Sequence, residues 1–186
     1  MKKLDKDVLY VLRTDKLHGK TEERVCKAAK KILEWKDTDT PLRIHREENG
    51  KPYFTGLPVF FSVTHSGEYW MCVFSNNPVG IDLQRKDTKN NGEKIARRFF
   101  HPEEVAFLEE HQWGAFFDVW AAKESYLKYT GRGIAGELGT FSVIDEGVWK
   151  KTIEGIPLQQ SKEFPHYSLF ICGGTGREIV TVTAEE

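Results

Sequence analysis

Two segments of this chain are unusually apolar around an acidic residue. Residues 79–84 form a strand-like stretch that contains Asp82, and residues 120–128 form a helix-like stretch that contains Glu124. Removing water from an unpaired carboxylate costs several kcal/mol or shifts its pKa, so a buried acid is expected to have a basic or metallic partner. If Asp82 and Glu124 converge, a hard divalent cation such as Mg²⁺ is the expected third component.

The length and composition are those of an ordinary globular protein. The 186 residues are enough for one large domain or for two small, closely packed halves. A formal net charge of −1 gives no reason to expect a nucleic acid or an anionic membrane as a partner. The charged start lacks an apolar signal segment, and no apolar run approaches the ~20 residues of a membrane span. Cys26, Cys72 and Cys172 are widely spaced, which predicts reduced thiols and a cytoplasmic protein.

The periodicity of apolar residues predicts an α+β protein. The expected strands are residues 8–12, 42–45, 59–63, 69–74, 79–83, 141–144, 167–172 and 178–183, and the expected helices are residues 21–35, 93–100, 102–111 and 114–129. Strands that occur in runs favour α+β over a doubly wound sheet. The glycine-rich residues 173–176 predict a hairpin turn. The polar segment 86–92 predicts a division into an N-terminal half, residues 1–86, and a C-terminal half, residues 87–186.

The helix predicted at residues 114–129 aligns three side chains on one face. Trp120, Glu124 and Lys128 follow one another at intervals of four residues. On most helices such a Glu–Lys pair is exposed and contributes a few tenths of a kcal/mol. Here most of the remaining helix surface is apolar, so a protected, functional pair is an equally good interpretation.

A strand is followed by three polar residues at Thr64, His65 and Ser66. Hydroxyls, backbone N–H groups and an imidazole at such a turn are able to bind a phosphate. For this short sequence alone, a histidine with satisfied hydrogen bonds at a strand end is the more frequent explanation. A hydrolase with Ser66 as its nucleophile is a weaker hypothesis, because no G-x-S-x-G sequence surrounds Ser66 and its histidine is adjacent in the chain.

Two further lysines lie where an anion is able to bind. Lys20 and Thr21 stand at a predicted helix start, with Thr21 as the expected N-cap and backbone N–H groups facing outward. The sequence is not a P-loop, because Thr14 occupies the position of the first glycine. Lys51 lies in a segment, residues 49–52, whose composition is that of a simple turn.

Taken in order, these pieces resemble the Sfp-type 4′-phosphopantetheinyl transferases. The segments that carry the resemblance are residues 50–52, 61–67, 79–82, 98–104 and 120–128. The resemblance implies a monomer of two similar α+β halves related by a pseudo-twofold axis, with coenzyme A in the cleft between them. It implies transfer of the 4′-phosphopantetheine arm of coenzyme A to a serine of an apo acyl- or peptidyl-carrier protein. Mg²⁺ is the implied cofactor and adenosine 3′,5′-bisphosphate the released product.

The resemblance also implies roles for individual residues. Asp82 and Glu124 would hold Mg²⁺ across the diphosphate, and Lys128 would neutralise the leaving phosphate. Glu124 and Glu104 are both candidates for the base that removes the serine proton, with Glu124 favoured. The residues implied to contact coenzyme A are Lys20, Thr21, Lys51, Pro52, Thr64 and His65. The carrier is expected to be acidic, with candidate contacts at Arg97, Arg98, Phe99, Phe100 and Phe107. For Phe99 and Phe100, a place in the core is at least as good an interpretation.

Gln84 departs from the family pattern. Many members have a second acid two positions after the aspartate, where this chain has an amide. An amide oxygen is able to ligate Mg²⁺, or a water completes the site, but one negative charge is lost. We therefore expect weaker or water-completed metal binding. The alternative function is a non-catalytic or weakly active coenzyme A- or carrier-binding protein of the same fold.

Overall fold

The chain forms two compact units, each with its own core. The computed structural model describes residues 4, 8–14, 20–34, 41–87, 92–133, 137–174 and 178–183. Unit 1 comprises Met1–Val79 and Gly174–Glu186, and unit 2 comprises Gly80–Gly173. The units therefore meet in the sequence near residue 79 instead of at the polar segment 86–92, because the strand at 79–85 pairs with later strands and the C-terminal strand returns to the first sheet.

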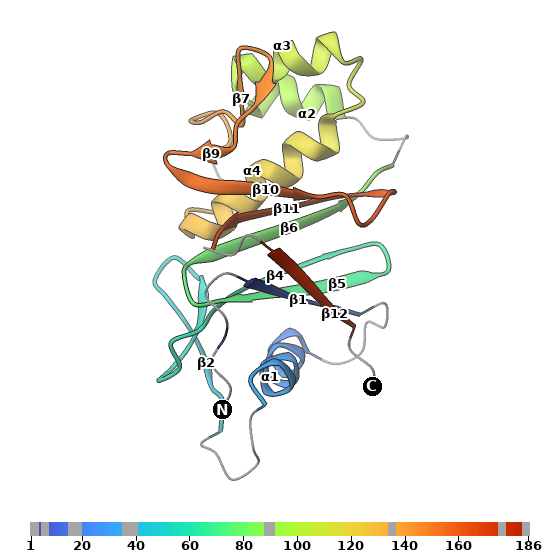
Figure 1. The fold of residues 1–186 in the computed structure, drawn as a ribbon. Coiled ribbons are helices and arrows are strands. Elements are labelled where there is room, and N and C mark those ends of the chain that lie inside the picture. The colour runs from blue at the N-terminus through green and yellow to red at the C-terminus, as the bar shows by residue number, and fades with distance from the viewer. Residues whose placement is uncertain are drawn as a thin grey trace. The chain divides into compact units, whose positions relative to one another are not determined.

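Unit 1 is built on a four-stranded sheet with the order β12-β1-β5-β4 (Figure 1). Its strands are β1 (Val8–Thr14), β4 (Phe60–Ser66), β5 (Tyr69–Ser75) and β12 (Glu178–Thr183). Strand β1 pairs in parallel with β12 and antiparallel with β5, and β4 and β5 form a hairpin. A separate hairpin joins β2 (Ile44–Arg46) to β3 (Pro52–Phe54).

Helix α1 (Thr21–Ile32) packs against the sheet of unit 1 (Figure 1). Val25, Ala28 and Ile32 are buried, which confirms the predicted apolar face, and Trp35 lies outside the described residues. The N-cap is Lys20, with extended backbone, and Thr21 is already helical, so the prediction of Thr21 as the cap was wrong by one residue. The carboxylate of Glu23 accepts a hydrogen bond from the Lys20 backbone N–H.

Unit 2 combines a second four-stranded sheet, in the order β6-β11-β10-β9, with three helices (Figure 1). Its strands are β6 (Val79–Arg85), β9 (Thr152–Ile153), β10 (Ile156–Ser161) and β11 (Tyr167–Gly173). Its helices are α2 (Gly92–Phe99), α3 (Pro102–Glu110) and α4 (Phe116–Thr130). Helix α4 packs along β11. After α4 the chain forms a short hairpin from two strands of two residues each, β7 (Ile144–Asp145) and β8 (Val148–Trp149).

The prediction of an α+β fold is confirmed, because the strands occur in runs before and after a block of helices. The predicted hairpin at residues 173–176 is wrong, since β11 pairs with β10 and β12 pairs with β1 of the other sheet. The predicted strand at residues 141–144 is reduced to its last residue, because side chains take the hydrogen bonds of Phe141 and Val143. No helix among the described residues is long and apolar enough to cross a bilayer.

Gly80 allows the backbones of β6 and α4 to pack in direct contact. A Cβ atom at Gly80 would overlap the carbonyl oxygen of Ser125 and the backbone nitrogen of Tyr129, both on α4. Asp82 follows two residues later on the same strand, so this close approach carries it along the helix that bears Glu124 and Lys128. The glycine therefore sets how β6 passes α4.

We expect Gly80→Ala to destabilise the protein by roughly 3 kcal/mol, the upper end of what overpacking costs, because the added methyl group meets backbone atoms that cannot rotate away. The measurement is urea unfolding. Gly114→Ala is the matched control, since its Cβ would lie 3.4 Å from one carbonyl oxygen, and it should change stability by less than about 0.5 kcal/mol. Equal stabilities of the two variants would contradict the role given to Gly80.

Candidate active site

Asp82 is the centre of a polar cluster in unit 2. Its side chain is buried on β6, and each of its carboxylate oxygens accepts a hydrogen bond. The Lys128 ammonium lies 2.6 Å from Oδ1, and the Gln84 amide nitrogen lies 2.8 Å from Oδ2. Gln84 reaches the same carboxylate because residues two apart on a strand share a face. Lys128 comes from α4, 46 positions later in the chain.

Glu124 lies one helical turn before Lys128 and has a different environment. Its side chain is buried, and Oε1 has no hydrogen-bond partner among the described residues. Burial, reinforced by the charge of Asp82, raises the pKa of the Glu124 carboxyl from 4.5 to about 7, and the nearby Lys128 ammonium opposes this shift. The two acids that stood apart in the sequence therefore act on each other electrostatically. Burying a carboxylate oxygen without a partner is costly unless a ligand completes it.

The donors in this cluster fit a hard divalent cation such as Mg²⁺. Asp82 and Glu124 supply carboxylate oxygens, and the side-chain carbonyl of Gln84 is a neutral oxygen donor. A cation would supply the interaction that the buried Oε1 of Glu124 lacks among the described residues. Within the described part of the chain, no group of three or more His, Cys, Asp or Glu is gathered to hold a metal ion.

Glu104 lies in a different polar cluster, which joins α3 to α4. The Lys123 ammonium lies 2.7 Å from Glu104 Oε1 and 2.7 Å from the carbonyl oxygen of Phe141. Glu104 also accepts hydrogen bonds from the backbone N–H groups of Val143 and His101. Both charged side chains are fully buried, and burial raises the pKa of Glu104 and lowers that of Lys123, while each partner opposes the other's shift. Breaking such a pair typically costs about 3–5 kcal/mol.

Adjacent positions on α4 serve these two clusters. Consecutive residues of a helix point about 100° apart, so Lys123 contacts Glu104 while Glu124 is directed toward Asp82. The carboxylate of Glu104 is occupied by three donors, whereas that of Glu124 keeps an oxygen without a partner. These contacts favour a structural role for Glu104 and a chemical one for Glu124.

Two of the predicted coenzyme A contacts lie side by side on β4 in unit 1. The Thr64 side chain is buried and the His65 side chain is exposed, as expected for neighbours on a strand, which face opposite sides. The strand runs on through Ser66 before it turns into β5. The same alternation directs His65 and Ser66 apart, which disfavours a nucleophile–base pair.

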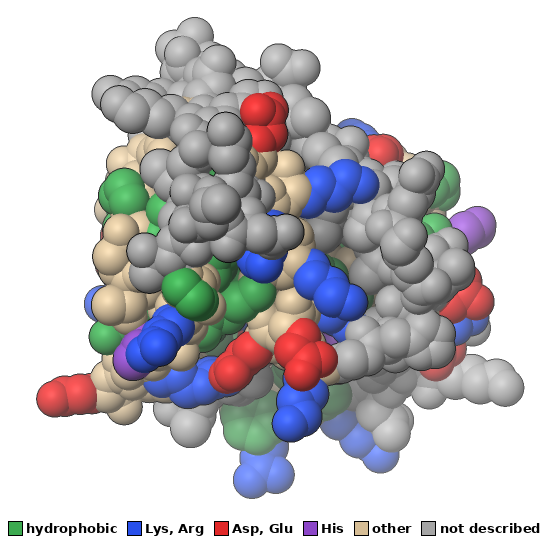
Figure 2. Space-filling view, turned by 90° about the horizontal axis from the view of Figure 1, so that it is seen from below, with side chains coloured by type: hydrophobic (Ala, Val, Ile, Leu, Met, Phe, Trp, Pro, Cys, Tyr) green, Lys and Arg blue, Asp and Glu red, His purple; other side chains and the backbone are tan. Residues whose placement is uncertain are grey.

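The other predicted contacts of unit 1 lie near one another. The Arg46 guanidinium donates to the carbonyl oxygen of Gly50 at 3.1 Å and to the carboxylate of Glu22 at 3.4 Å. It therefore ties the start of α1, residues 20–21, to the turn that precedes Lys51 and Pro52. On the face seen in Figure 2, lysine and arginine side chains are interspersed with Asp and Glu side chains over the described part of the surface.

The candidate carrier contacts divide into exposed and buried residues. Phe100 and Phe107 lie in the core of unit 2, which confirms the core interpretation of Phe100 and shows that the prediction of Phe107 as a carrier contact was wrong. Phe99 is 46% exposed at the end of α2, and the Arg98 guanidinium lies 5.0 Å from the centre of its ring. Arg97 instead binds Glu93 and Glu109 and stacks over Trp113. Arg98 and Phe99 therefore remain as an exposed pair.

A model of one protein family, the 4′-phosphopantetheinyl transferase superfamily, matches residues 78–182, more than half of the chain. The chain belongs to this superfamily. The matched segment contains Asp82, Gln84, Glu104, Glu124 and Lys128, whereas the candidate contacts in unit 1 precede it.

Relatives bear the same superfamily's name. The chain is 36% identical over 107 residues to the 4′-phosphopantetheinyl transferase Sfp of Bacillus subtilis (strain 168), a match that covers 55% of this chain and 47% of that protein. It is 38% identical over 104 residues to the 4′-phosphopantetheinyl transferase gsp of Aneurinibacillus migulanus, covering 54% and 43%. For the 4′-phosphopantetheinyl transferase HetI of Nostoc sp. the values are 36% over 103 residues, 50% and 44%. The chain thus spans about half the length of the relatives that it matches.

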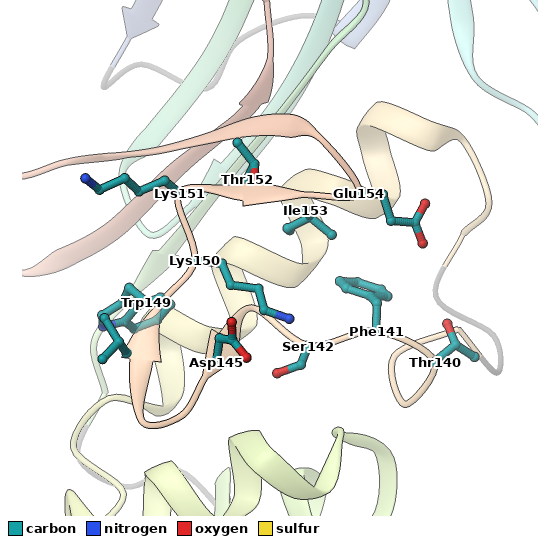
Figure 3. Close-up of a pocket in the computed structure, with 11 residues that line it drawn as sticks. Thr140, Phe141, Ser142, Asp145, Trp149, Lys150, Lys151, Thr152, Ile153 and Glu154 are labelled. Carbon is teal, nitrogen blue, oxygen red and sulfur yellow. The ribbon is translucent and has the colours of Figure 1, made fainter.

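A pocket of about 590 Å³ lies in unit 2 and is not lined by the acids of the candidate site (Figure 3). Its lining residues are 140–142, 145 and 148–154. Lys150 points toward Phe141, whereas Lys151 points away (Figure 3). Asp145 and Glu154 balance these two lysines, so the lining has no dominant charge. Sequence patterns missed this pocket because the strands β7, β8 and β9 around it are only two residues long.

The raised pKa of Glu124 predicts how stability depends on pH. The folded carboxyl binds its proton up to about pH 7, whereas the unfolded one releases it near 4.5, so the stabilisation is full below 4.5 and is lost as the pH rises to about 7. Glu124→Gln removes this titration and should raise the melting temperature above pH 7 relative to the parent protein. The measurement is thermal unfolding from pH 4 to 8 with and without Mg²⁺. Mg²⁺ should raise the melting temperature of the parent protein more than that of the variant. Parallel curves for the two proteins would contradict the assigned environment of Glu124.

Proposed function

We propose that this protein transfers the 4′-phosphopantetheine arm of coenzyme A to a serine of an apo acyl- or peptidyl-carrier protein in a Mg²⁺-dependent reaction. The observation that carries the proposal is the cluster in which an unpartnered Glu124 carboxylate stands beside the Asp82–Lys128 ion pair. This cluster lies within the segment that matches the superfamily, and the relatives are named for the same transfer.

The proposed reaction is a substitution at phosphorus. The serine oxygen forms a bond to the phosphorus that carries the pantetheine arm, and the bond from that phosphorus to the bridging oxygen of the diphosphate breaks. Adenosine 3′,5′-bisphosphate leaves with the bridging oxygen, and the serine proton passes to a base. Little covalent chemistry is required of the protein, so positioning and electrostatic stabilisation dominate the rate.

The residues of unit 2 supply these effects. Glu124 is the proposed proton acceptor, because a carboxyl with a pKa of about 7 is well matched to a base that acts near neutral pH. Lys128 provides a positive charge for the leaving phosphate from a side chain that is partly exposed. Asp82 and Glu124, with the side-chain oxygen of Gln84 or a water, would hold Mg²⁺. When bound, Mg²⁺ supplies positive charge to the diphosphate oxygens.

The residues of unit 1 are proposed to bind the nucleotide end of coenzyme A. Lys51 and Pro52 are assigned to the adenosine side, and Thr64 and His65 to the diphosphate side. Lys20 and Thr21 at the start of α1 are assigned to the 3′-phosphate, where helix N–H groups and a lysine favour an anion. The Arg46 contacts that join the helix start to the turn before Lys51 support a shared nucleotide surface.

We also propose a cytoplasmic monomer. Cys26, Cys72 and Cys172 are all described, and none forms a disulfide, which suits a reducing compartment. Each unit has its own core, so a second copy is not needed to bury apolar surface. A non-catalytic or weakly active coenzyme A- or carrier-binding protein is the second candidate, and it is favoured by the amide of Gln84 at a position where the family resemblance implies a second acid in many members.

The assay for the proposal is the mass of a carrier after incubation with the protein, coenzyme A and Mg²⁺. The carrier should gain one phosphopantetheine group. Asp82→Asn and Glu124→Gln should each lower the rate by at least about 10²-fold, because each removes a charge that acts on the reacting groups. Asp145→Asn, a carboxylate outside this cluster, is the matched control and should keep the parent rate. Coenzyme A binding without any mass gain would support the second candidate instead.

Carrier recognition is assigned to the exposed pair Arg98 and Phe99, which offers a cation and an apolar ring to an acidic carrier surface. Arg98→Ala and Phe99→Ala should each raise the KM for the carrier about 5- to 30-fold, as expected for a contact worth about 1–2 kcal/mol, while the KM for coenzyme A stays unchanged. Arg97→Ala is the control on the same helix, since its charge is already paired with Glu93 and Glu109. An equal effect of all three variants would place the carrier elsewhere.

A further inference from the structure

The two acids of the candidate metal site differ in how their oxygens are used. Both oxygens of Asp82 accept hydrogen bonds, Oδ1 from the Lys128 ammonium at 2.6 Å and Oδ2 from the Gln84 amide at 2.8 Å. Glu124 keeps Oε1 without a partner among the described residues. Both oxygens of Asp82 are therefore bound by side chains of this chain, whereas Glu124 retains a buried oxygen that a ligand could satisfy.

The Lys128 ammonium contacts Oδ1 of Asp82, an oxygen for which a divalent cation would compete. A divalent ion and an ammonium group cannot both contact Oδ1 closely, because their like charges repel strongly at such distances in a buried site. The Asp82 side chain is 4% exposed in the middle of β6, whereas the Lys128 side chain is 31% exposed and carries its ammonium on a flexible four-carbon chain. Of the two partners, the lysine is the one that is able to move.

Gln84 holds the same arrangement from the other side. Its amide N–H donates to Oδ2, a contact that a carboxylate at this position could not make, since two carboxylates would repel each other. The amide oxygen becomes a metal ligand only after the group rotates about its terminal bond. Gln84 thus stabilises the contact of Asp82 with this chain's own donors.

We propose that Lys128 and Gln84 form a lock on Asp82, which releases the carboxylate to a divalent cation when the diphosphate of coenzyme A draws the Lys128 ammonium away. This inference rests on the proposed function, because it requires the diphosphate to bind beside Lys128. The lock couples the two ligands: the diphosphate favours cation binding, and by thermodynamic reciprocity the cation favours diphosphate binding by the same factor. Lys128 is a positioning residue for the cation in addition to its role at the leaving phosphate.

The test measures Mn²⁺ binding by electron paramagnetic resonance, with the full chain and without a carrier. In the absence of coenzyme A, Lys128→Met should bind Mn²⁺ about tenfold more tightly than the parent protein, within the usual range of coupling between sites. Coenzyme A should strengthen Mn²⁺ binding by a larger factor in the parent protein than in Lys128→Met. Lys86→Met is the matched control, since it removes the same charge from unit 2 but from an exposed pair with Asp118, and it should leave Mn²⁺ affinity within about twofold.

A second measurement separates the contact itself from the general effect of removing a charge. Nitrogen-15 spectra of the lysine ammonium groups, with the Lys128 signal assigned by its loss in Lys128→Met, report whether this group stays bound. Saturating Mg²⁺ should shift the Lys128 signal toward that of a solvated ammonium and leave the Lys123 signal, which belongs to the buried pair with Glu104, in place. An unmoved Lys128 signal at saturating Mg²⁺ would overturn the lock.

Failure of the lock is distinguishable from failure of the proposed function. If the carrier gains mass but Lys128→Met binds Mn²⁺ no more tightly than the parent protein, the lock is wrong and the transferase stands. If Mn²⁺ binding tightens as expected and no carrier gains mass, the lock on Asp82 stands and the proposed reaction is wrong.

Discussion

The candidate site depends on the contact between the backbones of β6 and α4. Without a side chain at Gly80, the strand lies against the helix at the level of Ser125 and Tyr129. This spacing brings Asp82 on the strand close to Glu124 and Lys128, which lie one turn apart on the helix. A larger separation would leave Asp82 buried without its ammonium partner, which is an unfavourable state for a carboxylate.

Sequence patterns predicted the local parts of this arrangement well. The apolar face of α1 and the acids of both apolar segments followed from periodicity and from the cost of burying charge. The pairing of β12 with β1 did not, because it joins the two ends of the chain and no local signal marks it. The glycines near residue 174 suggested a hairpin, but the strands before and after them, β11 and β12, belong to different sheets. Local signals predict that a chain turns, and tertiary packing decides which strand it joins.

The functional residues show the same limit. The spacing of Glu124 and Lys128 on one helix face was evident, and the contact of Lys128 with Asp82 was not, because 46 residues separate them. Glu104 was an open candidate for the base until its neighbours were known. Its three donors are the backbone N–H of His101 before α3, the Lys123 ammonium on α4 and the backbone N–H of Val143 before β7, and no sequence spacing relates them. Gln84 was recognised as unusual, but its donor role toward Asp82 required the side-chain geometry.

The cluster around Lys123 and Glu104 has a consequence for association between molecules. Residues 141–143 are buried, belong to no strand and lie directly before β7. The carbonyl oxygen of Phe141 accepts a hydrogen bond from the Lys123 ammonium group, and the N–H of Val143 donates to the Glu104 carboxylate. The carbonyl oxygen of Val143 accepts from the backbone N–H of Lys150. The carbonyl group of Phe141 and the N–H group of Val143 are thus bound by the two members of the buried ion pair and are unavailable for pairing with a strand of another chain.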